Sequence, residues 1–294
     1  MGGERVIYYA CLLVLDILGK YSQTKYGRAI HGAFAVFVYS VITGVIASLF
    51  FFLSSGCKIH INFATFVYAL AFSLVVMVGY VATLFVVKFL DVSSVAVLTS
   101  TLSLLMSYLS GSIFLSESIS ATDAIKGVMM IAASILLHFP FKKGMLKFNP
   151  AGILLAFLSA CVTSSATIMS NLFANDSRVT DSNSYFFLTN VIIVIFSLFA
   201  SLILKKGNFR ALIKEFTTFP TKNYLHTAVV TMSSNIGSLF QILIFASGDG
   251  VIFYTPIASA LVLISSGIVA ILLKEKPKVI PLALACVSLF IGIF

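Results

Sequence analysis

Residues 79–136 read GYVATLFVVKFLDVSSVAVLTSTLSLLMSYLSGSIFLSESISATDAIKGVMMIAASIL, and the chain repeats the plan of this stretch, without a gap, over residues 237–294. In each copy an apolar segment, a turn with Asp, an apolar segment, a turn with Glu and a final apolar segment follow one another. The landmarks that coincide are Gly79 with Gly237, Asp91 with Asp249, and Glu117 with Glu275. The acidic matches are informative because the chain holds only ten Asp and Glu among 294 residues. Internal duplication of this kind is typical of membrane proteins built from structural repeats.

Hydrophobic residues make up 60% of the chain and charged residues 10%. Soluble domains contain roughly 45–50% apolar and about 25% charged residues, so the solvent around this chain must be largely lipid. In hydrocarbon only helices and closed barrels satisfy every backbone N–H and C=O group. Barrel strands alternate apolar and polar residues, whereas this chain has unbroken apolar runs of about 20 residues, the length of a membrane-spanning helix. The composition therefore predicts an all-α polytopic membrane protein.

The apolar segments predict ten transmembrane helices, most of them joined by short connections. Their ranges are approximately 6–24, 30–54, 62–87, 93–115, 121–139, 149–172, 184–204, 224–247, 251–273 and 279–294. We expect residues 1–148 to form one five-helix repeat and residues 149–294 the second, within a single membrane domain. Because five is an odd number, the second repeat must face the opposite side of the membrane. The two repeats are thus predicted to be inverted, with a pseudo-twofold axis in the membrane plane.

The net charge of +9 arises from basic residues in the connections, a placement that favours lipid headgroups over nucleic acid as the partner. Fifteen of the 19 Lys and Arg residues lie in the connections after odd-numbered predicted helices or at the adjoining helix ends, and the other four are Arg5, Lys58, Lys126 and Arg178. The positive-inside rule therefore places the fifteen in the cytoplasm and both termini outside.

The longest connection, residues 205–223, reads KKGNFRALIKEFTTFPTKN. Its apolar residues recur at helical spacing with basic residues between them; they are Phe209, Leu212, Ile213 and Phe216, interleaved with Arg210 and Lys214. This pattern predicts an amphipathic helix in the plane of the lipid headgroups, with a solvated loop as the alternative.

The other turns carry residues that are common at helix ends. Asp91, Glu117, Asp249 and Glu275 are expected to cap helices or to be solvated in loops. Ser120-Ala-Thr-Asp123 has the pattern of a capping box that opens the fifth predicted helix.

Ionisable residues inside the predicted helices mark candidate functional positions, because charge is costly in lipid. Asp16 and Lys20 stand four residues apart in the first helix, a spacing that allows the two side chains to pair. We expect Asp16 to be a candidate site of proton coupling and Lys20 to be a cavity residue. The alternative for Lys20 is that its ammonium group reaches back to the membrane surface.

Polar side chains also follow one face of the eighth and sixth predicted helices. In the eighth they are Thr227, Thr231, Ser234, Asn235, Ser238 and Gln241, and in the sixth Thr163, Ser164, Thr167, Ser170 and Asn171. The carboxamides of Asn171, Asn235 and Gln241 need partners in lipid, which favours a cavity lining over close helix packing alone. Tyr80 and Tyr254 are candidate aromatic walls of this cavity, although interfacial Tyr is common in membrane proteins.

The sequence shows no pattern of catalytic or metal-binding residues. The histidines, His31, His60, His138 and His226, stand apart near helix ends without a second ligand at metal spacing. The four cysteines lack paired spacing, and neither a nucleophile elbow nor a phosphate-binding Gly loop occurs. We therefore expect no metal, no cofactor and no enzyme activity.

Two short motifs carry a family resemblance. FLSESI at 114–119 precedes the Gly- and Ala-containing segment 126–134, and LLKEK at 272–276 precedes the apolar segment 283–294. Together with two five-helix halves, these turns resemble the drug/metabolite transporter superfamily, in particular its EamA-like branch. Gly79-Tyr80 and the turn at 91–94 are similar to the family's third and fourth helices, and Lys20 to a lysine often found in its first. Two features depart from the family: its termini are commonly cytoplasmic, and its frequent first-helix Trp is missing here.

The resemblance implies a secondary transporter that moves a small polar or amphipathic metabolite by alternating access, with export as the expected direction. The expected cavity residues are Lys20, Tyr80, Ser164, Thr167, Asn171, Thr231, Ser234, Asn235, Ser238, Gln241 and Tyr254. A nucleotide-sugar or sugar-phosphate exchanger of the same superfamily is the alternative, and an embedded enzyme or a scaffold is a third interpretation. The implied location is a bacterial cytoplasmic membrane, with the protein as a monomer or a homodimer.

Overall fold

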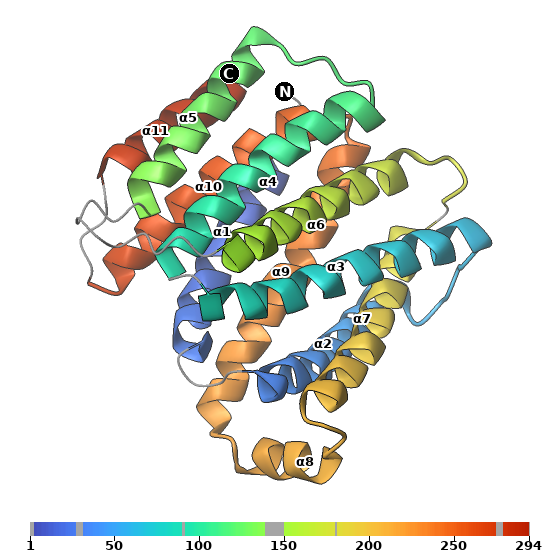
Figure 1. The fold of residues 1–294 in the computed structure, drawn as a ribbon. Coiled ribbons are helices and arrows are strands. Elements are labelled where there is room, and N and C mark those ends of the chain that lie inside the picture. Colours follow the sequence, from blue (N-terminus) through green and yellow to red (C-terminus); the bar gives the residue numbers. More distant parts are fainter. Residues whose placement is uncertain are drawn as a thin grey trace. The chain divides into compact units, whose positions relative to one another are not determined.

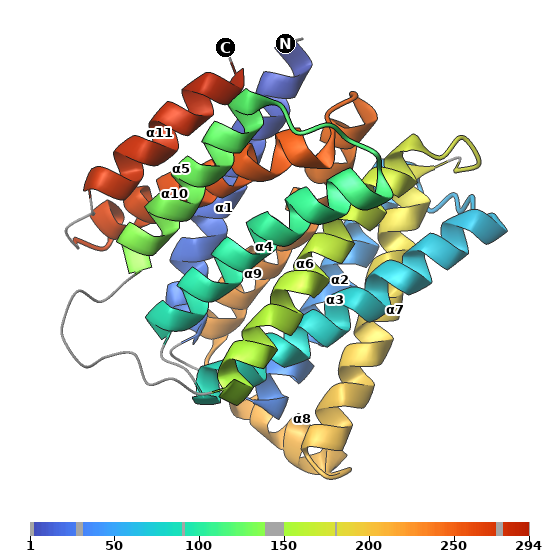
Figure 2. The ribbon, with the colours of Figure 1, turned by 45° about the horizontal axis from the view of Figure 1, so that its top comes forward.

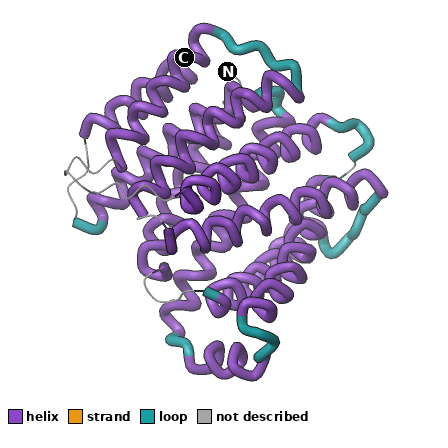
Figure 3. The backbone as a smooth tube through the Cα atoms, in the orientation of Figure 1, coloured by secondary structure: helices purple, strands orange, loops and turns teal. Residues whose placement is uncertain are grey.

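A computed structural model describes residues 3–27, 32–89, 92–138, 150–179, 181–274 and 279–293. Within these ranges the chain forms eleven helices and no strand (Figure 3). The helices are α1 (Gly3–Gly27), α2 (Ala33–Ser55), α3 (Phe63–Phe89), α4 (Val92–Phe114), α5 (Ala121–His138), α6 (Pro150–Asn175), α7 (Ser182–Leu204), α8 (Phe209–Thr218), α9 (Thr221–Ala246), α10 (Val251–Leu272) and α11 (Val279–Ile293). The all-helical prediction is confirmed for the part of the chain that the structure describes.

Five of these helices are long and apolar enough to cross a membrane: α2, α6, α7, α9 and α10. Large apolar side chains remain exposed along the helices, with Leu53, Phe63 and Ile203 among the most exposed at 80%, 82% and 76%. A protein surrounded by water does not expose so many large apolar side chains, whereas lipid accepts them readily. The helices therefore belong to an integral membrane protein. The ten crossings and the inverted repeat stay predictions.

The helices are grouped into two compact units, each of which combines separate parts of the chain. The first unit comprises Met1–Leu13, Val78–Asn175 and Gln241–Phe294, and the second comprises Val14–Met77 and Asp176–Phe240. Helices α1, α3 and α9 are each divided between the two units. Both units thus draw on both predicted halves of the sequence.

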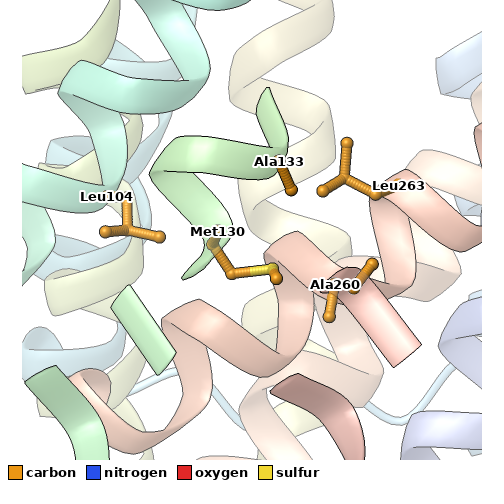
Figure 4. Close-up of a cluster of buried hydrophobic side chains, with 6 residues drawn as sticks. Leu104, Met130, Ala133, Ala260 and Leu263 are labelled. Carbon is orange, nitrogen blue, oxygen red and sulfur yellow. The ribbon is translucent and has the colours of Figure 1, made fainter. Parts of the chain in front are cut away.

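In the first unit, α4, α5, α10 and α11 lie side by side, and α6 packs along α4 (Figures 1 and 2). Their buried core contains Leu104, Met130, Ala133, Ala260 and Leu263, from α4, α5 and α10 (Figure 4). The two alanines on facing helices let the backbones approach closely, which is how membrane helices gain packing energy without a hydrophobic drive between them.

In the second unit, α2 packs along α7, and aromatic rings fill the contact. Phe51 stacks on Phe187 with ring centroids 4.4 Å apart, while Phe50 meets Phe186 edge to face at 5.3 Å. Such pairs add about 0.5–1.5 kcal/mol each beyond the area that they bury.

Helix α8 confirms the helical prediction for the 205–223 connection. Asn208 caps it by accepting a hydrogen bond from the N–H of Ala211 at 3.0 Å. Leu212 is fully buried, and the ring of Phe216 meets that of Phe37 of α2 edge to face at 5.6 Å. The predicted apolar face of the segment therefore packs, in part, on α2.

The capping box at the start of α5 is confirmed. Ser120 Oγ accepts a hydrogen bond from the N–H of Asp123 at 3.1 Å, and Asp123 Oδ2 accepts one from the N–H of Ser120 at 3.3 Å. Asp181 caps α7 in the same manner, accepting from the N–H groups of Asn183 and Ser184. Asp91 and Glu275 lie outside the described residues.

Candidate functional site

The predicted cavity residues are distributed over the two units, and we describe each group by itself. The second unit holds Asp16, Lys20, Thr231, Ser234, Asn235 and Ser238. The first unit holds Ser164, Thr167, Asn171, Gln241 and Tyr254. Tyr80 belongs to α3 in the first unit, but its side chain lies outside the described part of the chain.

The charged pair of the second unit lies where α1 meets α9. The carboxylate of Asp16 interacts electrostatically with the ammonium group of Lys20. Between them Gly19 faces α9, because a Cβ atom at this position would lie 3.1 Å from Cβ of Ser233. The turn of α1 that carries the two charges therefore packs against α9 at Ser233, which lies on a different face of that helix from the polar stripe.

Most hydroxyl groups of the α9 stripe are already satisfied within the helix. Thr231 Oγ1 donates to the carbonyl oxygen of Thr227 at 2.8 Å, and Ser238 Oγ donates to that of Ser234 at 3.1 Å. The hydroxyl of Ser234 also forms a hydrogen bond with the hydroxyl of Tyr39 of α2. These hydroxyl groups can serve a helix interface as well as a ligand.

Asn235 is different, because its side-chain nitrogen lacks a hydrogen-bond partner among the described residues. The residue is only 7% exposed. Leaving a buried donor unsatisfied costs about 1–3 kcal/mol, so such a group usually has a ligand or a water as its partner. Asn235 lies one helical turn from Thr231 and immediately follows Ser234. This amide is the part of the stripe that is most typical of a binding group.

Sequence reasoning missed Asn190 of α7, which also belongs to the second unit. Its Nδ2 atom donates to the carbonyl oxygen of Phe186 at 2.8 Å, whereas its Oδ1 atom has no partner among the described residues. The residue is 2% exposed. A carboxamide inside an apolar segment was the signal available in the sequence, because it carries the same cost as Asn171 and Asn235.

In the first unit, Asn171 and Tyr254 border a buried polar network at the turn between α9 and α10. Asp249 accepts hydrogen bonds from Arg5 Nη1 at 2.8 Å and from the Tyr9 hydroxyl at 3.0 Å. Asn171 Nδ2 lies 3.5 Å from the carbonyl oxygen of Asp249, and the ring of Tyr9 stacks near that of Tyr254 at 6.3 Å. The network ties α1, α6 and the turn together.

Of the two acidic residues of this region, Glu117 caps a helix, as the sequence suggests, whereas Asp249 does not. Asp249 does not cap α10; its side chain is 3% exposed and paired with Arg5. Glu117 takes that role from another connection, accepting from the N–H groups of Val251 and Ile252, both at 2.8 Å. A Cβ atom on Gly250 would lie 2.8 Å from the Glu117 carboxyl carbon, so a side chain at this position would displace the carboxylate.

The remaining predicted residues of the first unit make ordinary contacts. The hydroxyls of Ser164 and Ser110 form a hydrogen bond of 2.9 Å between α6 and α4. Thr167 Oγ1 donates to the carbonyl oxygen of Thr163 at 3.1 Å. Gln241 is half-buried.

Lys126 is buried in α5, within the helix that the sequence predicts over residues 121–139. Its Nζ atom lies 2.7 Å from Oδ1 of Asp123 and 4.6 Å from the ring centroid of Phe253. A carboxylate and an aromatic face together compensate an ammonium group that has left water. The spacing of three residues between Asp123 and Lys126 was the signal that could have found this pair.

Outside the apolar helices, one connection of the second unit carries a strong local ion pair. Hydrogen bonds from Arg178, 2.7 Å away, hold the pKa of the Asp176 carboxyl below its ordinary value. The same end of the unit includes His60, whose N–H donates to Ser184 Oγ at 2.9 Å. No group of three His, Cys, Asp or Glu residues that could hold a metal ion occurs in the described ranges.

A solved structure shares this fold over nearly the whole chain. This crystal structure, described simply as that of a protein, has a TM-score of 0.71 and 15% sequence identity to this chain. The match covers 99% of this chain and 96% of that one. No family model and no curated protein matches the sequence. The likeness concerns the fold alone.

Proposed function

We propose that the protein is a secondary transporter of the drug/metabolite transporter superfamily, in its EamA-like branch. It would comprise ten spans in two inverted repeats and move a small polar or amphipathic metabolite across a bacterial cytoplasmic membrane, with export as the expected direction. Alternating access is the mechanism by which repeat-built carriers of this kind work. The apolar composition, the duplicated sequence plan, the charged pair of α1 and the polar face of α9 support the proposal.

The unpaired amide of Asn235 is the observation that carries the proposal. A buried donor without a protein partner takes its hydrogen bond from a water or a ligand, and in a carrier the substrate can replace that water during the working cycle. Helix α1, which contacts α9 through Gly19 and Ser233, adds the interacting pair Asp16 and Lys20. Ionisable groups inside a membrane usually mark a substrate or proton pathway.

These residues suggest a division of roles. Lys20 would attract an anionic group of the substrate, while Asn235 and Ser234 would orient the substrate by hydrogen bonds. Because Asp16 and Lys20 attract each other, an anionic substrate would compete with Asp16 for the ammonium group. A proton that neutralises Asp16 would favour the substrate in this competition, which couples proton binding to substrate binding.

A thermal-shift screen of the purified protein against metabolites tests the binding half of the proposal. A ligand that binds only the folded state raises the apparent stability in proportion to the logarithm of its concentration. We expect small anionic metabolites to raise the Tm of the wild type and to lose most of this effect in Asn235→Leu and Lys20→Gln. Lys58→Gln, an exposed control with the same substitution as at position 20, should respond as the wild type does.

The same screen separates the alternatives. A response confined to nucleotide sugars or sugar phosphates would favour an exchanger of those compounds. Ligand responses that are equal in the wild type and Asn235→Leu would contradict the assignment of the site to α1 and α9.

A further inference from the structure

The apolar side of α8 is only partly covered by the described residues of the second unit. Leu212 is buried, and Phe216 meets Phe37 of α2. At the edge of this side, Phe209 and Ile213 remain 48% and 43% exposed, although both are large and apolar and the ring of Phe209 also meets that of Phe37. They are four residues apart and therefore lie on the same side of the helix.

Basic residues run beside this exposed apolar row. Arg210 and Lys214 immediately follow Phe209 and Ile213 in sequence, and both are exposed. Their spacing of four residues forms a second row parallel to the first. An apolar row flanked by a cationic row fits the boundary between acyl chains and headgroups.

The charge around α8 is strongly one-sided. Between residues 205 and 222 the chain has five basic residues, Lys205, Lys206, Arg210, Lys214 and Lys222, and a single acidic one, Glu215. Glu215 is bonded to Lys205, with Nζ and Oε1 2.6 Å apart. Lys206 and Lys222 are exposed like Arg210 and Lys214. Four cations thus face outward without an acidic partner among the described residues.

Because α8 packs at one end of α2, its exposed apolar and basic residues lie at the depth of the lipid headgroups. The helix packs on the first turns of α2, where Phe37 contacts both Phe209 and Phe216. Because α2 is an apolar helix of 23 residues, long enough to cross a membrane, an element packed at its end lies near a membrane surface.

We infer that α8 and its flanking residues form a binding surface for the headgroups of anionic phospholipids. Arg210 and Lys214, with Lys206 and Lys222, contact the phosphate and glycerol oxygens, while Phe209 and Ile213 enter the adjacent acyl region. This inference does not rest on the proposed transport function, because it concerns a different surface.

The absence of Trp from the sequence makes a direct test possible. Ile213→Trp introduces a single indole at the proposed surface, and lipids brominated on the acyl chain quench an indole that they contact. The protein is reconstituted in vesicles in which either phosphatidylglycerol or phosphatidylcholine is brominated at equal mole fraction. We expect brominated phosphatidylglycerol to quench the indole more than brominated phosphatidylcholine does, by about fivefold for each contributing cation. This selectivity should fall at high salt.

Two comparisons complete the test. Adding Arg210→Gln and Lys214→Gln to Ile213→Trp should bring the selectivity close to unity, while thermal unfolding of the Trp variant reports whether the fold is retained. Ile59→Trp, in an exposed connection beyond the other end of α2, should show little selectivity. Any one of three results would overturn the inference. Both lipids could quench equally, or the selectivity could survive the double substitution. Inorganic phosphate at moderate concentration could also abolish the selectivity.

Discussion

Individual carboxylates hold the ends of helices in both units, and Glu117 is the clearest case. Its two oxygens accept the first two free N–H groups of α10 from a connection that is distant in sequence. The N-terminus of a helix carries a partial positive charge, so an ionised carboxylate gains both hydrogen bonds and a favourable dipole interaction there. One side chain thereby fixes the α4–α5 connection to the start of α10.

Replacing Glu117 therefore tests whether this contact stabilises the protein. We expect Glu117→Ala to lower the free energy of unfolding by about 1–2 kcal/mol and Glu117→Gln by less, because the amide retains one acceptor oxygen. Glu215→Gln, at a partly exposed ion pair, should change it by less than about 1 kcal/mol. The measurement is denaturant unfolding in detergent; equal losses at the two positions would contradict the capping role.

Asp181 provides a pH-dependent prediction at the same scale. Burial tends to raise the pKa of its carboxyl, but hydrogen bonds from Ser184 and from the N–H groups of Asn183 and Ser184 outweigh burial and lower it below the ordinary value of 3.8. A lowered pKa in the folded state means that the stabilising effect is complete above the ordinary pKa and disappears as the pH falls through the lowered one.

The expected result is a stability difference between the wild type and Asp181→Ala of about 1 kcal/mol at neutral pH that shrinks below roughly pH 4. Asp181→Ser keeps an uncharged oxygen that can accept hydrogen bonds from the same N–H groups. The difference in unfolding free energy between Asp181→Ser and Asp181→Ala should therefore not depend on pH. Unfolding curves at neutral and acidic pH measure both differences. A loss on Asp181→Ala that is the same at every pH would contradict the assignment.

At the scale of elements, apolar periodicity was sufficient to predict the helices, and the local patterns at 120–123 and 209–216 predicted a capping box and α8. Each of these depends on residues that are near in sequence. Asp249 was wrongly expected to cap a helix or to be solvated, and the burial of Lys126 was not predicted. Their partners, Arg5 and Phe253, are distant in sequence. Sequence identifies a buried charge as expensive, but the partner that compensates it depends on tertiary packing. For the candidate site, residue types were predictable, while the unpaired nitrogen of Asn235 required coordinates.

Helix packing in the first unit depends on Gly79, one of the duplicated glycines. A Cβ atom at this position would overlap Cγ1 of Val162 of α6. Alanine favours a helix over glycine by about 1 kcal/mol, whereas overpacking costs about 1–3 kcal/mol, so Gly79→Ala should be destabilising overall.

In a Val162→Ala background the overlap is removed, and Gly79→Ala should then become neutral or stabilising. A double-mutant cycle measured by thermal unfolding reports this change of sign. If Gly79→Ala has the same effect in both backgrounds, the contact with Val162 does not limit the approach of α3 and α6.

At the scale of the whole molecule, the second unit has two distinct ends. Cys57 follows the last turn of α2, whereas α8 packs on its first turns. A helix of 23 residues is about 34 Å long, comparable to the hydrocarbon thickness of roughly 30 Å. If α2 spans the membrane, Cys57 and α8 face opposite compartments.

The distribution of Lys and Arg predicts that the Cys57 end lies outside the cell. A membrane-impermeant maleimide should label Cys57 in intact cells. In a Cys57→Ser background, it should label Thr218→Cys only after permeabilisation. Labelling of both positions from one side would show that α2 does not span the membrane, and the reverse pattern would show that the orientation is wrong.

The measurement that tests the central claim most directly is flux of a ligand found in the thermal-shift screen, in vesicles that contain the purified protein. The account predicts saturable transport that an imposed pH gradient accelerates. Lys20→Gln should abolish this transport, whereas Lys58→Gln should preserve it. In Asp16→Asn the transport rate should no longer depend on pH. Flux no greater than in protein-free vesicles, for a ligand that binds the wild type, would contradict the claim that this protein is a carrier.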